Sequence, residues 1–250
     1  MDMEGNELLR VNHLKKYFQT PHGTLSAVDD VTFGINKRET LGVVGESGCG
    51  KSTLGRCILR LHEPTAGEVV FEGKNILACD KKEMKSLRSK MQIIFQDPYA
   101  SLNPRMTVSQ AIAAPLIIQG VYSAKEKEKI QKKVAEMMDV VGLASRLVNS
   151  YPHELDGGRR QRIGIARALS LDPKFIVCDE PVSALDVSIQ AQVLNLMQDL
   201  QQQMGLTYLF ITHNLSVVKH LSNQIVVMYL GQLVEKASPD QLFHNPCHPY

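Results

Sequence analysis

The sequence predicts an α/β fold built on a sheet that helices cover on both faces. Strand-like apolar runs alternate with helix-like patterns along the chain, and four of these runs are Thr40–Val44, Met91–Phe95, Phe175–Cys178 and Tyr208–Thr212. Runs that are apolar at consecutive positions are typical of strands with no solvent-facing side. The core is therefore expected to be an α/β sheet.

Two further stretches predict antiparallel additions to this core. The turn-forming segment Pro64–Gly67 leads into a mixed strand at Glu68–Phe71, and Gln224–Tyr229 followed by Gly231–Glu235 is typical of a hairpin. We therefore expect an antiparallel β subdomain near the N-terminus and a late antiparallel hairpin.

The middle of the chain has a helical pattern instead. From Thr107 to Gly142, apolar residues recur at helical spacing, with Ser123 as the expected N-cap of one helix. We expect a helical subdomain over approximately residues 98–170, inserted into a single domain that spans residues 1–250.

The composition is that of an ordinary globular protein and argues against several classes. Against 26 Asp and Glu, 28 Lys and Arg give a net charge of +2 over 250 residues, so a nucleic-acid-binding polycation is not expected. Five cysteines without a Cys-x-x-Cys pair predict neither a disulfide framework nor a zinc site, and they favour a reducing compartment. Charged residues are spread through Met1–Phe18, so we expect no signal peptide. No apolar run approaches the ~20 residues that span a bilayer.

The sharpest motif is a glycine-rich loop that directly follows a predicted strand and opens a predicted helix. Residues 45–52 match G-x-x-x-x-G-K-[ST], the pattern of a phosphate-binding loop. Glycines let backbone N–H groups converge on an anion, and the helix N-terminus adds a positive dipole. We expect Lys51 to reach the β- and γ-phosphates of ATP and the Ser52 hydroxyl to bind Mg²⁺. The expected nucleotide contacts are Gly45, Glu46, Ser47, Gly48, Cys49, Gly50, Lys51, Ser52 and Thr53.

A second apolar strand ends in two acids, Asp179 and Glu180. An aspartate at the end of such a strand is suited to hold Mg²⁺ through its hydration shell, and the next acid is suited to polarise an attacking water. We expect Asp179 to serve the metal and Glu180 to act as the general base. Loop and acids together predict a P-loop NTPase core.

Further residues follow in the order of the ATPase subunits of ATP-binding cassette (ABC) transporters, which the chain resembles over nearly its whole length. Tyr17 resembles the aromatic residue that stacks on adenine, Gln96 the glutamine that senses magnesium and water, and His213 the switch histidine. Leu155–Arg162 resembles the family signature, and Ser183–Asp186 resembles its dimer-contact loop.

This resemblance implies an ABC ATPase nucleotide-binding domain that works as a head-to-tail dimer. Gln96, Glu180 and His213 would then be catalytic, and Ser52, Gln96 and Asp179 would hold the metal. It also implies two transmembrane permease subunits, an extracytoplasmic substrate-binding protein and a peripheral position at the cytoplasmic face of the cell membrane.

Two segments narrow the resemblance within the family. Phe95–Arg105 and Asn245–Tyr250 resemble the ATPase subunits of oligopeptide, dipeptide and nickel importers. ATP hydrolysis is thus expected to drive import of di- or oligopeptides, with import of nickel or a metal chelate as the alternative. Chains of that subfamily usually continue past the His-Pro-Tyr segment, so a chain ending at Tyr250 resembles one shortened before its C-terminal extension.

The signature departs from the family at one position that matters. Asp156 stands where the family has Ser, ahead of Gly157 and Gly158, and these three are expected at an ATP site shared with the partner subunit. Asp is also an excellent helix N-cap, which is the alternative interpretation. Because a carboxylate repels a γ-phosphate, we expect a heterodimer in which a paralogous ATPase subunit completes this chain's site, with a dimer of two copies of this chain as the alternative.

Three other classes of protein share the phosphate loop. A DNA-repair or chromosome-organising ATPase should carry long coiled coils, zinc fingers or a basic face, which this sequence lacks. A P-loop kinase should lack the Gly157-Gly158 segment and the paired acids. A non-catalytic regulatory subunit stays open because of Asp156.

Overall fold

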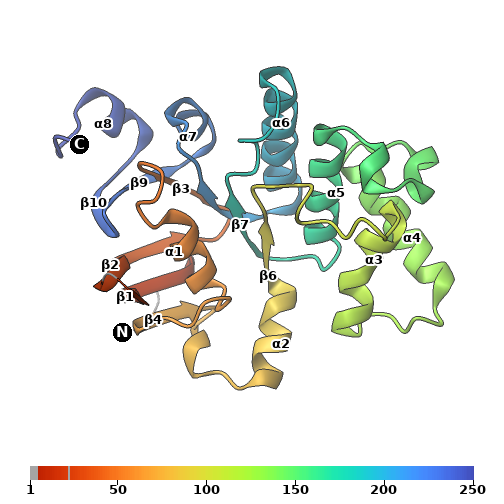
Figure 1. Ribbon diagram of the computed structural model, residues 1–250, viewed down its shortest axis with the longest axis horizontal. Helices are drawn as coiled ribbons and strands as arrows, with labels where there is room; N and C mark the ends of the chain where they lie inside the picture. The colour runs from red at the N-terminus through yellow and green to blue at the C-terminus, as the bar shows by residue number, and fades with distance from the viewer. Residues whose placement is uncertain (1–4, 22) are drawn as a thin grey trace. The chain divides into compact units, whose positions relative to one another are not determined.

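A computed structural model describes residues 5–21 and 23–250. The chain divides into two compact units, the first comprising residues up to Met84 together with Met204–Tyr250, and the second comprising Lys85–Gln203. Each unit is described in turn, with element labels as in Figure 1.

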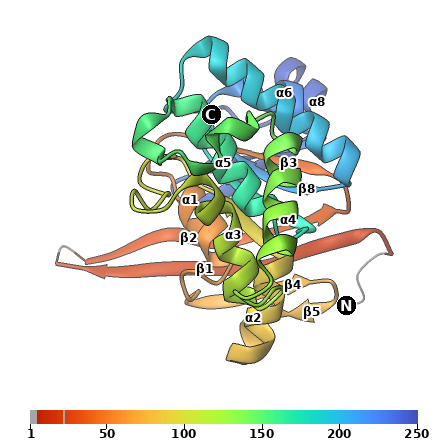
Figure 2. The same cartoon turned by 90° about the vertical axis from the view of Figure 1, so that its right-hand side faces the viewer.

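An antiparallel sheet forms one part of the first unit. Its strand order is β2-β1-β4-β5, with bounds β1 (Glu7–Thr20), β2 (Gly23–Asn36), β4 (Ala66–Phe71) and β5 (Lys74–Asn75). Figure 2 shows β1 and β2 as long ribbons side by side. The expected antiparallel subdomain near the N-terminus is present.

The first unit also holds the strands that position the phosphate loop. The strand β3 (Thr40–Val44) lies between β8 (Thr207–Ile211) and β9 (Gln224–Tyr229), parallel to both. Every residue of β3 and β8 is buried, as strands covered on both faces require. The late hairpin was expected as an antiparallel addition, but only β10 (Gln232–Ala237) is antiparallel. The strand β9 itself continues the parallel sheet.

Four helices accompany these strands. They are α1 (Lys51–Ile58), the 3₁₀ turn η1 (Ile76–Ala78), α7 (Leu215–Leu221) and α8 (Pro239–His244). Val218 of α7 packs with Val44 and Ile225, and Leu242 and Phe243 of α8 cover that cluster. The C-terminal helix is thereby anchored behind the strand that leads into the phosphate loop.

The second unit is mainly helical. After α2 (Lys81–Lys90), the parallel strands β6 (Met91–Ile94) and β7 (Phe175–Asp179) enclose the helical stretch in sequence. The helices are α3 (Val108–Gln119), α4 (Lys127–Val140), η2 (Ser145–Asn149), η3 (Pro152–Glu154) and α5 (Gly157–Leu169), and α6 (Val187–Met204) follows β7. Figure 1 shows α3, α4 and α5 gathered together, within residues 98–170.

One helix start differs from its prediction. The α4 helix begins at Lys127, and Ser123 is not its N-cap. The backbone N–H of Ser123 donates to the Glu126 carboxylate (2.8 Å), and the Glu126 N–H donates to the Ser123 carbonyl (2.9 Å). These bonds close a turn over residues 123–126, so the helix starts only after it.

Close packing between α5 and α6 generates a stability prediction. A Cβ on Gly158 would lie 2.6 Å from Cγ2 of Ile189, whereas a Cβ on Gly164 of the same helix meets nothing within 4 Å. Gly158→Ala should therefore lower the free energy of unfolding by about 1–3 kcal/mol. Gly164→Ala is the matched control and should be neutral or stabilising, since alanine favours helix.

Urea denaturation measures the free energy of unfolding of both variants. Adding Ile189→Ala to Gly158→Ala should restore part of the lost stability, because it removes the clashing methyl group. Equal stabilities of Gly158→Ala and Gly164→Ala would contradict the packing argument.

Candidate functional site

The phosphate loop lies between the end of β3 and the start of α1. Three of its glycines have positive φ: Gly45 at 151°, Gly48 at 80° and Gly50 at 106°. A Cβ on Gly45 would lie 2.1 Å from the Met228 carbonyl oxygen, and one on Gly50 would lie 1.9 Å from that of Ala27. Both backbone conformation and space thus require glycine at these two positions.

The lysine of the motif lies against the loop. Lys51 is 4% exposed, and its ammonium donates to the carbonyl oxygens of Gly45 (2.8 Å) and Glu46 (2.7 Å). Of the side chains that the structure describes, none caps the start of α1, and its first turn carries no acid. A buried cation beside an uncapped helix N-terminus suits an anion, as the motif predicts.

The remaining loop residues surround these groups. Glu46, Ser47 and Gly48 are exposed, Cys49 is buried, and Ser52 and Thr53 are half-buried in the first turn of α1. The predicted phosphate contacts are therefore on one contiguous stretch.

Tyr17 is half-buried on β1 and is held by its hydroxyl. This hydroxyl donates to Oδ1 of Asp29 (2.5 Å), and Oδ2 of Asp29 accepts from the Gln232 amide (3.2 Å). The hydrogen bond raises the pKa of Tyr17 and lowers that of Asp29, because it stabilises the phenol and the carboxylate. The sequence did not indicate Asp29 as a site residue.

The turn between β9 and β10 connects Asp29 to the phosphate loop. The Asp29 N–H donates to the Gly231 carbonyl (2.8 Å), and the Gly231 N–H donates to the Cys49 carbonyl (2.9 Å). Tyr17 and the phosphate loop are thus joined through one side-chain hydrogen bond to Asp29 and two backbone hydrogen bonds beyond it.

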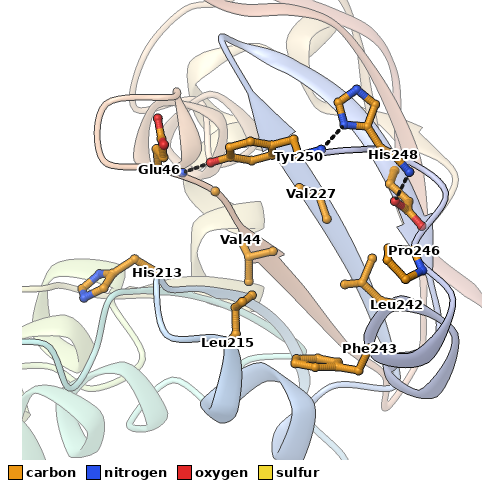
Figure 3. Close-up of a pocket in the computed structure, with 12 residues that line it drawn as sticks. Val44, Glu46, His213, Leu215, Val227, Leu242, Phe243, Pro246, His248 and Tyr250 are labelled. Carbon is orange, nitrogen blue, oxygen red and sulfur yellow. Dashed lines mark hydrogen bonds between the residues drawn. The ribbon is translucent and has the colours of Figure 1, made fainter.

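His213 follows β8 and is exposed. It lines a cavity together with Gly45 and Glu46, and Figure 3 shows it beside Leu215, apart from Glu46. His213 and the phosphate loop therefore line one cavity in the first unit.

In the second unit, β7 ends at the two acids. Asp179 is 1% exposed, and Glu180 is half-buried with a φ of 47°, a left-handed conformation that is uncommon for a residue with a side chain. The Ser183 N–H and hydroxyl both donate to the Glu180 carbonyl (3.2 and 3.1 Å). These bonds hold the strained residue in place.

The structure brings the side chains of Gln96 and Glu180 into contact. The Gln96 amide nitrogen donates to Oε2 of Glu180 (3.0 Å). The contact follows from parallel pairing, because Ile94 of β6 lies opposite Cys178 of β7 and both strands end at one edge.

The signature segment forms the start of α5. Asp156 is the N-cap, with Oδ1 accepting from the Arg159 N–H (2.8 Å), while Oδ2 lies 3.2 Å from the Arg159 guanidinium. Asp156 therefore caps the helix, as expected for this residue type. Gly157 and Gly158 open the helix and pack against Leu185 and Ile189, which gives both glycines a structural role.

A strand, a glycine-rich loop with an internal lysine and a helix, together with a strand that ends in two acids, define a P-loop nucleotide-binding protein. The family model described as "ABC transporter" matches residues 28–183. The chain belongs to the ABC transporter family, and the resemblance predicted from its motifs is confirmed.

The chain is similar to curated and solved members of this family. It is 59% identical to the oligopeptide transport ATP-binding protein OppF of Bacillus subtilis, over 98% of this chain and 80% of that protein. It is 51% identical to the dipeptide transport ATP-binding protein DppF of Haemophilus influenzae, over 99% of this chain and 76% of that protein.

A solved ATP-binding cassette, a dimer in a post-hydrolysis state bound to ADP and phosphate, matches with a TM-score of 0.84 and 27% identity. The structural match covers 93% of this chain and 99% of the solved chain. The α/β cassette fold predicted from the sequence is confirmed.

The contact between Asp29 and Tyr17 generates a prediction about nucleotide binding. Asp29→Ala should weaken ATP binding several-fold, because it releases the ring expected to stack on adenine. Tyr17→Phe should have a similar effect and Tyr17→Ala a larger one. Titration calorimetry measures the dissociation constants.

The control is Asp30→Ala, which removes a neighbouring carboxylate that contacts His13 instead. Inorganic tripolyphosphate lacks the base, so its affinity should be the same in all four variants. An Asp29→Ala protein that binds ATP as tightly as the unmodified protein would refute the role of Asp29.

Proposed function

We propose that this chain binds and hydrolyses ATP to power the import of oligopeptides or dipeptides. The observation that carries the proposal is the 59% identity to an oligopeptide transport ATP-binding protein over 98% of the chain. The glycine-rich loop with Lys51 bonded to its carbonyls supports it, because both features suit a triphosphate.

In this proposal, residues Gly45–Thr53 cradle the phosphates and Tyr17 supplies a stacking face for adenine. Lys51 exchanges the carbonyls of Gly45 and Glu46 for phosphate oxygens when the nucleotide binds. The exchange lets the buried ammonium keep its hydrogen bonds in both states.

Mg²⁺ fits the donors that the resemblance assigns to it. Ser52, Gln96 and Asp179 offer a hydroxyl, an amide and a carboxylate oxygen, which are hard ligands. Across residues 5–21 and 23–250, no group of three or more His, Cys, Asp or Glu side chains is arranged to hold a metal. A cation held by few protein oxygens and by substrate phosphates is the usual state of Mg²⁺, which would neutralise charge on the phosphates when bound.

The hydrolytic step is assigned to Glu180. Its carboxylate accepts a proton from the attacking water, and the hydrogen bond from Gln96 orients it. His213 contacts the γ-phosphate in this proposal, and Asp156, Gly157 and Gly158 face the nucleotide of the partner subunit.

The partners in this proposal are a second ATP-binding subunit, two permease subunits and an extracytoplasmic binding protein. The similar solved cassette is a dimer, which supports the first of these. No helix in the part of the chain that the structure describes has the length and apolar character to cross a membrane. We propose a peripheral position at the cytoplasmic face, where permease subunits would anchor the chain.

Transport assays test the substrate. The chain is reconstituted in proteoliposomes with its permease subunits and binding protein, and uptake of labelled oligopeptides, dipeptides and nickel is compared. ATP-dependent uptake of a peptide supports the proposal, and uptake of nickel alone overturns the peptide assignment.

Lys51 and Glu180 should separate binding from chemistry. Lys51→Ala should weaken ATP binding about tenfold to hundredfold, because charge-assisted hydrogen bonds to the phosphates are lost. Glu180→Gln should keep ATP affinity and lower kcat about 100-fold or more. Binding titrations and single-turnover hydrolysis measure the two effects, and wild-type turnover by Glu180→Gln would exclude it as the base.

Asp156 should impair the site that it completes. Asp156→Ser should raise the ATPase activity of a homodimer several-fold and change a heterodimer with the paralogous subunit less, because only the homodimer has two such sites. Asp156→Asn is the matched control for charge, since Asn also caps helices and should preserve stability. Robust hydrolysis by the unmodified homodimer, unchanged by both substitutions, would leave Asp156 as a helix cap only.

A further inference from the structure

A tail segment, Asn245–Tyr250, follows α8 and returns to the phosphate loop. Glu235 on β10 holds this tail by its backbone. The two carboxylate oxygens of Glu235 accept from the N–H groups of Cys247 (3.0 Å) and His248 (2.9 Å), and these bonds lower the pKa of Glu235. The tail is therefore tied to the sheet just before its last residues.

Tyr250 connects the tail to the phosphate loop. Its hydroxyl accepts a hydrogen bond from the backbone N–H of Glu46 at 2.9 Å, across 204 positions of sequence. Its ring packs against Tyr229 with centroids 4.7 Å apart, and its own N–H donates to Nδ1 of His248 (3.2 Å). Figure 3 shows the Tyr250 side chain pointing at Glu46.

Glu46 is thereby held on both sides of its backbone. Its carbonyl oxygen accepts from the Lys51 ammonium (2.7 Å) and from the Cys49 N–H (3.3 Å), while its N–H donates to Tyr250. When Lys51 turns to the phosphates, the carbonyl loses its strongest partner. The hydrogen bond to Tyr250 does not depend on that exchange and remains available to fix the loop.

A cavity beside the phosphate loop makes the hydrogen bond between Glu46 and Tyr250 important for the shape of the loop. The space between the loop and the tail is a cavity of about 580 Å³, lined on one side by Gly45 and Glu46 and on the other by Leu242, Phe243 and Pro246. Because side chains do not fill this space, the face of the loop toward the tail lacks the close packing that would otherwise hold its shape.

We infer that Tyr250 is a positioning residue for ATP binding: its hydroxyl holds the Glu46 end of the phosphate loop in the shape that receives the nucleotide, and Glu235 presents it by fixing the tail. The inference rests on the proposed function of the loop as the ATP site. It assigns a role in the site to a segment that the sequence marks only as typical of a subfamily.

The test measures ATP hydrolysis by the protein with Tyr250→Phe and Glu235→Ala, singly and combined. Tyr250→Phe removes only the hydroxyl and should raise the KM for ATP about threefold to tenfold, the effect of one neutral hydrogen bond, with kcat and the melting temperature unchanged. Glu235→Ala should shift KM in the same direction. The combined variant should lose no more than the larger single effect, since both act through one contact.

Lys219→Met is the matched control. It removes a contact between the Lys219 ammonium and the Phe243 ring (4.9 Å) at α8 but touches neither the tail nor the loop, so its KM should be that of the unmodified protein. An unchanged or lowered KM in Tyr250→Phe, or multiplying effects in the combined variant, would overturn the inference. Lys51→Ala distinguishes failure of the proposed ATP site from failure of the role of Tyr250. If Lys51→Ala binds ATP with normal affinity, the proposed ATP site is wrong. If Lys51→Ala loses affinity while Tyr250→Phe keeps a normal KM, only the role of Tyr250 is wrong.

Discussion

The first unit depends on the close approach of backbone carbonyls to the glycines of the phosphate loop. The carbonyls of Met228 and Ala27 occupy the space where side chains of Gly45 and Gly50 would lie. Strands β9 and β2 therefore confine the loop by main-chain atoms and not by side chains. The hydrogen bond from Gly231 to Cys49 adds a third main-chain restraint. Main-chain restraints of this kind limit the conformations open to the loop, and such preorganisation reduces the entropy lost on binding.

In the second unit, backbone geometry again positions the candidate site residues, here through the pairing of two strands. Two parallel strands end at one edge, and this places the amide of Gln96 against the carboxylate of Glu180, while the bonds from Ser183 hold the Glu180 backbone. Asp156 is positioned differently, because its carboxylate caps its own helix and is also paired with the Arg159 guanidinium. Both oxygens of this carboxylate are therefore already engaged by Arg159 of the same helix.

Much of the fold was predictable because buried strands leave a local signal. The predicted strand Thr40–Val44 has the bounds of β3, and β7 extends its prediction by Asp179 alone. The strands β1 and β2 left no such signal, because irregular pairing between Val11 and Lys16 breaks their alternation. The motifs named the loop and the acids, but Asp29 and Tyr250 were missed. Their contacts depend on strand register and on the path of the tail, which spacing along the sequence does not encode.

The left-handed backbone of Glu180 has an evolutionary consequence. At a φ of 47° a side chain costs about 1–2 kcal/mol relative to glycine, and the bonds from Ser183 maintain this strained state. Glycine at this position would relieve the backbone strain of the turn but would remove the carboxylate. With Glu180 as the proposed general base, selection for stability and selection for turnover would oppose each other at this residue, and a lineage released from ATP hydrolysis would be expected to lose the carboxylate there first.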